Sequence, residues 1–188
     1  MNQKYLSLLF LTSLLMIGCS IKSEDGQNDS DLEGFIESEK IVSETEAGEF
    51  VLRLVSEKAR YKLGEKVDVR GKLKYIGENA EIEISHSESP FFFEVIEVNR
   101  GVEIPYFLNE VLEMTLLKNN EWYEEEFHKR IDNHAADEYD EFFQIFMVEE
   151  GFPVGEYEIE LRADFLTSAG EESESHNYNT SIVIDVKE

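Results

Sequence analysis

Four histidines, one cysteine and 42 acidic residues are the side chains of this chain that could take part in catalysis or metal binding. The sequence has no His-Glu-x-x-His spacing and no second cysteine for a zinc site. It also has no Gly-x-Ser-x-Gly elbow and no glycine loop for phosphate. Carboxylate pairs at any chosen spacing are expected by chance among so many acids. The sequence therefore predicts a protein that is not an enzyme. The histidines are His86, His128, His134 and His176.

The single cysteine, Cys19, ends an apolar N-terminal run. Residues 5–17 are predominantly apolar, Lys4 precedes them, and the small Gly18 stands just before the cysteine. A run of about 13 residues is too short to span a bilayer, which takes about 20. The arrangement resembles the signal peptide of a bacterial lipoprotein, with Met16 in place of the usual leucine. The alternatives are a secretory signal with an unrelated cysteine and an uncleaved N-terminal anchor.

The lipoprotein resemblance implies a modification and a location. In that family the cysteine thiol receives a diacylglycerol, the preceding peptide is removed, and an acyl group such as palmitate is often added. We therefore expect residues 1–18 to be a signal peptide. We expect the mature chain to be anchored to the cell membrane, on its extracytoplasmic face, through lipidated Cys19. Two acyl chains are enough for stable anchoring.

The chain is strongly acidic, with a formal net charge of -25. The predicted signal peptide contains one charged side chain, Lys4, so its removal leaves 16 basic residues against 42 acidic ones. Such a surface repels nucleic acid and anionic lipid headgroups, and we predict no nucleic-acid partner. A saline or alkaline habitat, a cationic partner or divalent cations would each favour an acidic exterior, and habitat is the simplest explanation.

The segment after the predicted signal peptide is polar, acidic and without periodicity, which predicts a flexible tether over residues 19–47. Within it, Asp29, Asp31 and Glu33 stand at the first, third and fifth positions of a loop that partly resembles an EF-hand. Lys40 occupies the twelfth position, where an EF-hand has glutamate. The three acids are therefore weak calcium candidates, and a solvated linker is the preferred interpretation. No other cofactor is predicted.

From about residue 48 the apolar residues recur with a period of two, the pattern of half-buried strands. Short strands, glycine-containing turns and no long helix predict one all-β domain over 48–188, an antiparallel β-sandwich. Residues 142–148 are expected to form a strand that pairs with the strand over 155–165. The expected core residues are Leu52, Leu54, Val67, Val69, Leu73, Ile82, Ile84, Phe92, Phe143, Ile145, Tyr157, Ile159, Leu161, Ile182 and Ile184.

Three segments of this domain resemble a known family. They are Tyr61-Lys-Leu-Gly-Glu-Lys-Val67 before a strand, Gly77-Glu-Asn79 at a turn, and Phe152-Pro-Val-Gly-Glu-Tyr-Glu-Ile159 before an outer strand. Their order is similar to the immunoglobulin-like modules of Gram-positive surface lipoproteins and, more loosely, to the BsuPI-type proteinase-inhibitor domain. The resemblance implies an immunoglobulin-like fold. It also makes proteinase inhibition through a protruding loop an alternative function.

Residues 102–139 exceed what a minimal sandwich needs and contain the only tryptophan. Tyr106, Trp122, Tyr123 and Phe127 lie there among carboxylates, and large amphipathic rings suit the centre and rim of a protein interface. These four residues are the predicted binding surface. The alternative is that Trp122 packs against the sandwich. The acids within 132–141 suit calcium, although a solvated loop is the simpler interpretation.

These observations favour a non-catalytic binding or accessory lipoprotein. Its partner would be another, unidentified extracellular protein, and the acidity of the chain makes a cationic protein a candidate. A proteinase inhibitor and a calcium-binding acidic surface module are the alternatives.

Overall fold

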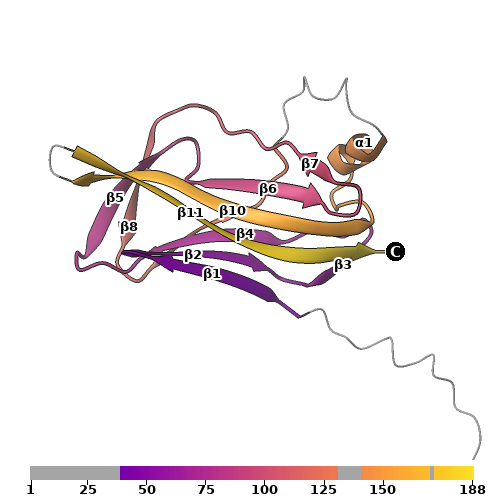
Figure 1. The fold of residues 1–188 in the computed structure, drawn as a ribbon, viewed down its shortest axis with the longest axis horizontal. Coiled ribbons are helices and arrows are strands. Elements are labelled where there is room, and N and C mark those ends of the chain that lie inside the picture. Colours follow the sequence, from indigo (N-terminus) through magenta and orange to yellow (C-terminus); the bar gives the residue numbers. More distant parts are fainter. Residues whose placement is uncertain (1–38, 131–140, 170–171) are drawn as a thin grey trace, which may run out of the picture. The chain divides into compact units, whose positions relative to one another are not determined.

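A computed structural model describes residues 39–130, 141–169 and 172–188 of the chain. All of them lie in the second of two compact units, which spans 36–188. They form eleven strands and one short helix, so the predicted all-β class is confirmed for this part of the chain. The strands make two sheets that pack as a β-sandwich (Figure 1).

The first sheet, called sheet A, contains four antiparallel strands. In spatial order they are β1 (Ile41–Ala47), β2 (Phe50–Ser56), β4 (Val69–Tyr75) and β9 (Trp122–Glu126). A two-residue turn joins β1 to β2, because Ala47 pairs with Phe50. Gly48 occupies the first turn position with a φ of 59°, which is typical of the tight turns that match strand twist.

The second sheet, called sheet B, runs in the order β3 (Arg60–Lys62), β11 (Glu172–Lys187), β10 (Gly155–Ala169), β5 (Glu81–His86) and β8 (Glu113–Lys118). β6 (Phe91–Glu97) pairs with the first half of β10 and with β7 (Val102–Ile104). β3 and β11 are parallel, and the other pairs are antiparallel. The long β10 extends beyond β6 and pairs with β5, so β5 and β8 lie at one end of the sandwich and α1 (Glu141–Val148) lies toward the other (Figure 1).

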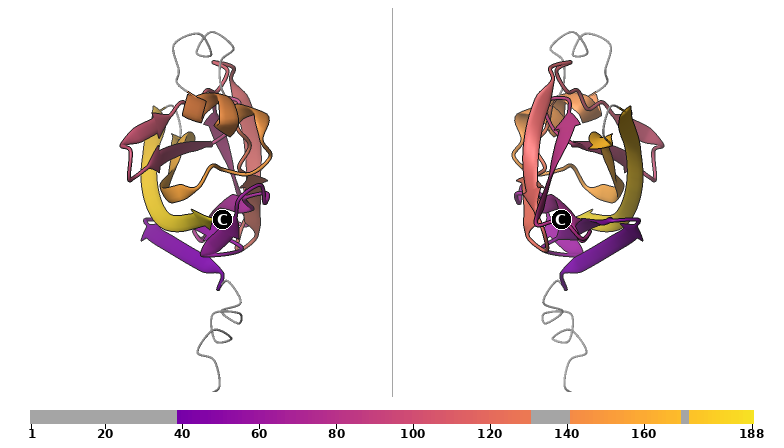
Figure 2. Two further views of the ribbon diagram at one scale, coloured as in Figure 1. Left: turned by 90° about the vertical axis from the view of Figure 1, so that its right-hand side faces the viewer. Right: turned by 90° about the vertical axis from the view of Figure 1, so that its left-hand side faces the viewer.

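The core lies between the two sheets. Alternate side chains of each strand point inward, and Leu52, Leu73, Ile84, Ile159 and Leu161 are completely buried. Figure 2, which looks along the length of the sandwich, shows strands of both sheets surrounding this core. The apolar side chains removed from water there are the main favourable contribution to folding.

The sandwich begins earlier than predicted, because β1 lies inside the segment that was expected to be tether. Two of the side chains on the inner face of β1, Ser43 and Thr45, carry hydroxyl groups. Thr45 Oγ1 donates to the carbonyl oxygen of Asn179 at 2.8 Å, and Thr180 Oγ1 donates to Ser43 Oγ at 2.7 Å. Hydrogen bonds to β11 therefore hold β1 where apolar contacts usually would, and for this reason the period-two pattern is weak.

The prediction of a strand over 142–148 is wrong, because these residues belong to helix α1. Phe142, Phe143 and Phe146 follow helical spacing, which puts them on one stripe. Phe146 is fully buried, whereas Ile145 is 41% exposed and is not the core residue predicted. Phe92 is also not the core residue predicted. It is only half-buried and lies under the guanidinium of Arg162, 4.7 Å from its ring centroid.

Candidate functional site

An exposed apolar surface lies over the β8 edge of sheet B. It consists of Val111, Leu112, Met114 and Leu116 on or just before β8, and of Leu166 on β10, and we call it the β8 patch. Leu112, Met114 and Leu116 are 75%, 62% and 52% exposed. A contiguous group of large exposed apolar side chains is uncommon on a soluble domain and marks a site of contact.

Strand register brings the β8 patch together. Ser85 of β5 pairs with Leu166 of β10 on one side and with Met114 of β8 on the other. Leu116 lies on the same face as Met114, because side chains alternate along a strand. Leu117 points the opposite way and is buried. Residues far apart in the sequence therefore become neighbours on the outer face of sheet B.

The apolar residues at 112, 114 and 116 were visible as a period-two run in the sequence. Such a run normally indicates the buried face of a strand. The structure reverses this expectation, because the buried face of β8 carries Thr115 and Leu117 and its exposed face carries Met114 and Leu116. The sequence thus contained the signal of the site, and only the fold showed on which face it lies.

His86 fixes β8 from the inner side of the sheet. Its Nδ1 lies 2.7 Å from the carbonyl oxygen of Ser87, and its Nε2 lies 2.8 Å from Thr115 Oγ1. A carbonyl oxygen only accepts, so Nδ1 carries the proton and, in the neutral ring, Nε2 accepts the hydrogen bond of the threonine hydroxyl. Both ring nitrogens of this buried histidine are therefore satisfied, and its role is structural.

Two hollows adjoin the β8 patch. The larger, of about 320 Å³, is lined by Val111, Leu112 and Leu166 and by His86. The smaller, of about 130 Å³, lies between β8 and β9, and its lining includes Leu116. Small-molecule sites usually enclose about 300–1,000 Å³ and surround most of their ligand. These two hollows are open to solvent, which suits side chains of a protein partner.

Carboxylates surround the β8 patch. Glu81 and Glu83 lie on the adjacent strand β5, Glu113 begins β8, and Glu110 precedes it. All four are exposed, and the ion pairs between described residues include none of them. Lys118, the cation at the end of β8, lies 4.0 Å from Glu121. The surface is therefore an apolar centre with a predominantly negative rim.

The predicted aromatic surface is not a single surface in the structure. Phe127 is 6% exposed and packs edge-to-face on Phe93, with 5.4 Å between ring centroids, so its prediction as a contact residue is wrong. Trp122 lies on the outer face of sheet A between two cations. The guanidinium of Arg53 and the ammonium of Lys74 stand 4.3 Å and 4.6 Å from its ring centroid.

The two predicted tyrosines are half-buried. Tyr106 packs on Phe127 with ring centroids 6.2 Å apart, and burial raises its pKa to about 12. The hydroxyl of Tyr123 donates to Glu125, and burial is the main cause that raises the pKa of Tyr123. Both hydroxyls therefore stay protonated at neutral pH. Of the four predicted residues, Trp122 and Tyr123 line the smaller hollow and thus adjoin the β8 patch.

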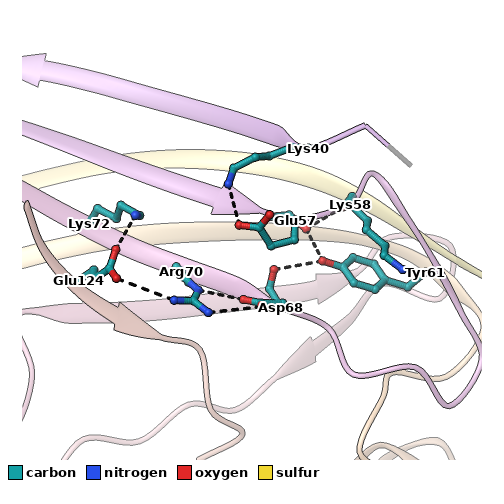
Figure 3. Close-up of polar contacts among 9 residues, drawn as sticks. Lys40, Glu57, Lys58, Tyr61, Asp68, Arg70, Lys72 and Glu124 are labelled. Carbon is teal, nitrogen blue, oxygen red and sulfur yellow. Dashed lines mark hydrogen bonds and ion pairs between the residues drawn. The ribbon is translucent and has the colours of Figure 1, made fainter. Parts of the chain in front are cut away.

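Basic residues on sheet A are held in ion pairs. Figure 3 shows Arg70 between Asp68 and Glu124, with nitrogen–oxygen distances of 3.1 Å and 3.8 Å, and Lys72 on the same glutamate. Nearby, the hydroxyl of Tyr61 donates to the carbonyl oxygen of Asp68 at 3.1 Å (Figure 3). Exposed pairs of this kind each contribute little to stability. They neutralise these cations, so this face is poorly suited to an anionic ligand.

Cys19, the calcium candidates Asp29, Asp31 and Glu33, and the acids of 132–140 lie outside the described residues. Within the described ranges, no group of three or more His, Cys, Asp or Glu is arranged to hold a metal ion. No helix in the same ranges is long and apolar enough to cross a membrane.

No protein-family model matches the chain, and no curated protein and no solved structure is significantly similar to it. The class of protein therefore follows from the fold and surface themselves. They define an acidic β-sandwich with an apolar surface on one edge strand.

Proposed function

We propose that the chain is a lipid-anchored binding module on the extracytoplasmic face of a bacterial cell membrane, and that it contacts another extracellular protein through the β8 patch. The observation that carries the proposal is the exposure of Leu112, Met114 and Leu116 on the edge of an otherwise acidic domain. Burial of apolar surface contributes about 25 cal/mol per Å², so covering these side chains with a partner is favourable.

The proposed location rests on the N-terminal segment. Cys19 follows a short apolar run and a small residue, the arrangement that resembles a lipoprotein signal peptide. A lipid anchor would hold the sandwich close to a membrane, where it meets other surface proteins at high local concentration. The rigid sandwich would then present β8 to them.

The inhibitor and calcium alternatives stay predictions. Inhibition needs a protruding loop that fits a protease cleft, and calcium binding needs the acids near 29–33 or 132–141. No contact between described residues favours either function over the binding module.

Metabolic labelling with palmitate tests the anchor. We expect label in the wild-type chain and none in Cys19→Ala, which should accumulate as an unprocessed precursor or appear as soluble protein. Label that still enters Cys19→Ala would contradict the proposal. Cys19→Ser replaces the thiol by a hydroxyl in a side chain of nearly the same shape, and it should lose the label in the same way.

Site-specific photo-cross-linking on intact cells tests the contact surface. A photoreactive residue in place of Leu116 should give a discrete adduct, whereas one in place of Ser181, on the outer face of β11, should not. A second change, Met114→Lys, should abolish the adduct, because it places a charge inside the apolar contact. Equal adducts from both positions, or an adduct that persists in Met114→Lys, would show that the contact lies elsewhere.

A further inference from the structure

We propose that β8 receives an extended segment of a partner protein as an additional strand of sheet B, and that this segment combines alternating apolar side chains with basic residues at its ends. The inference rests on the proposed binding function and names the class of partner. Strand addition to an open sheet edge is a general mode of peptide recognition, in which main-chain hydrogen bonds give affinity and side-chain pockets give specificity.

The backbone of β8 is available for such pairing. β8 is the last strand of sheet B. Asn119 N–H donates to the carbonyl oxygen of Ala80 at 2.8 Å, just beyond the paired residues of β8 and β5. Bonding alternates along an antiparallel pair, so Leu117 and Thr115 also bond to β5. Met114 and Leu116 then direct their N–H and C=O groups to the open edge. The same two residues carry the exposed apolar side chains.

Other edge strands lack this combination. β1 exposes Glu44 and Glu46 in the sequence IVSETEA, and β9 contains three consecutive glutamates, of which Glu124 is exposed, in the sequence WYEEE. β3 and β7 have three residues each, too short to pair stably with a further strand. Proteins commonly protect their edges with charges and short strands. Over Met114–Leu117, β8 carries no charge. Of the edge strands, it is therefore the one where pairing with an added strand buries the fewest charged side chains.

An added strand would find apolar neighbours on the outer face of sheet B, where its side chains would lie beside Met114 and Leu116. The hollow between β8 and β9, whose lining includes Trp122 and Tyr123, adjoins the same edge. Cross-strand contacts of apolar and aromatic side chains each contribute to sheet stability. The edge thus selects a segment that is apolar at alternate positions.

The rim of the β8 patch selects the charge of the segment. Glu81, Glu83, Glu110 and Glu113 lie around the edge without an ion pair to another described residue. A basic residue at either end of the partner strand would gain favourable electrostatic energy there, and an acidic one would be repelled. The net charge of -25 adds a long-range attraction for a cationic partner.

Binding of synthetic peptides to the full chain in detergent tests the inference. The probe is a peptide of about seven residues, Lys-Val-Thr-Val-Thr-Val-Lys, which spans β8 at the usual strand rise. Two further peptides carry backbone N-methyl groups, one on the valines and the other on the threonines. Only alternate N–H groups of an added strand face its neighbour, so one methylated peptide should bind about tenfold more weakly, and the other should bind like the parent.

A peptide of reversed charge and two substituted proteins complete the experiment. A peptide with glutamate in place of both lysines should bind at least about tenfold more weakly at low salt, and this difference should shrink as salt is added. Leu116→Pro removes an N–H from the open edge while leaving the bonds to β5, so it should weaken binding of the parent peptide. Glu46→Pro, on the edge of β1, is the matched control and should not. If Leu116→Pro fails to fold, the methylated peptides decide, because they leave the protein unchanged.

Each outcome is informative. If both methylated peptides bind like the parent, or both bind weakly, strand addition is wrong. The binding function then still stands if Leu116 cross-links to a partner in cells, and it fails with the inference if Leu116 does not. Sedimentation of the chain alone that shows a dimer lost in Leu116→Pro would identify the occupant as a second copy, which would overturn the assignment to a partner protein.

Discussion

Lys129 is the side chain on which the end of helix α1 depends. Its ammonium group donates hydrogen bonds to the carbonyl oxygens of Phe146, Glu149 and Gly151, at 2.5 Å, 2.8 Å and 2.7 Å. The last carbonyls of a helix have no partner within the helix, and a basic side chain there satisfies them. The ammonium also lies 4.3 Å from the ring centroid of Phe146, and burial lowers the pKa of Lys129 to about 8.

Replacing Lys129 by methionine should therefore destabilise the domain. Methionine keeps the aliphatic stem and removes the donors, so we expect the free energy of unfolding to fall by about 1–3 kcal/mol. Lys118→Met is the matched control, because Lys118 is exposed and its ammonium lies 4.0 Å from Glu121. Urea denaturation of both variants measures the difference. Equal losses would mean that the three carbonyl contacts contribute nothing specific.

Gly71 determines how closely the two sheets approach. It lies on the inner face of β4, and a Cβ atom there would stand 3.0 Å from Leu161 Cδ1 and 3.2 Å from Phe93 Cζ. These distances are shorter than ordinary van der Waals contact, so a methyl group at this position would push the side chains of Leu161 on β10 and Phe93 on β6 by a few tenths of an ångström. The packing of one sheet on the other therefore favours glycine at this position.

The change Gly71→Ala should accordingly cost about 1–3 kcal/mol through overpacking. The cost should be smaller in a Leu161→Val background, because the shorter side chain withdraws the nearest methyl group. A double-mutant cycle measured by thermal and urea unfolding isolates this coupling. Strictly additive effects would show that the contact with Leu161 is not the cause.

Charges of the whole domain are divided between its two outer faces. The outer face of sheet A carries cations such as Arg53 and Lys72, and Glu44 and Glu124 neutralise these two. On sheet B, Glu94 and Glu160 stand directly opposite each other, an arrangement of like charges that is unfavourable. The described strands thus differ, because sheet A pairs opposite charges and sheet B, which ends at β8, places like charges side by side.

Stability at alkaline pH should follow the buried tyrosines and Lys129. Burial raises the pKa of Tyr61, Tyr106, Tyr123, Tyr157 and Tyr178, in the case of Tyr106 to about 12. Above pH about 10, unfolded tyrosines lose protons that the folded state retains, so the free energy of unfolding falls as pH rises.

Lys129 changes the free energy of unfolding with pH in the opposite direction. Its pKa of about 8 in the folded state lies below that of an unfolded lysine, so between these values the unfolded state binds more protons and stability rises with pH. We therefore expect the denaturation midpoint to rise from pH 8 toward 10 and to fall beyond it. Circular dichroism in urea at a series of pH values measures this curve. Tyr106→Phe should reduce the fall and Lys129→Met should remove the rise; a curve unchanged by either variant would contradict the assignment.

The sequence by itself determined the all-β class, most of the strand positions in β2, β4, β10 and β11, and much of the core, because alternation of apolar and polar residues follows directly from strand geometry. Only the tertiary structure decided which face of a strand meets the core. Phe127 was predicted to be a contact residue and is buried, whereas Leu116 belongs to an apolar period-two run and is exposed. Both outcomes depend on strands distant in the sequence: β6 covers Phe127, and the pairing of β8 with β5 turns Leu116 to the outer face of sheet B. Contacts between distant segments decide which side chains are buried, and the local alternation of apolar and polar residues does not contain that information.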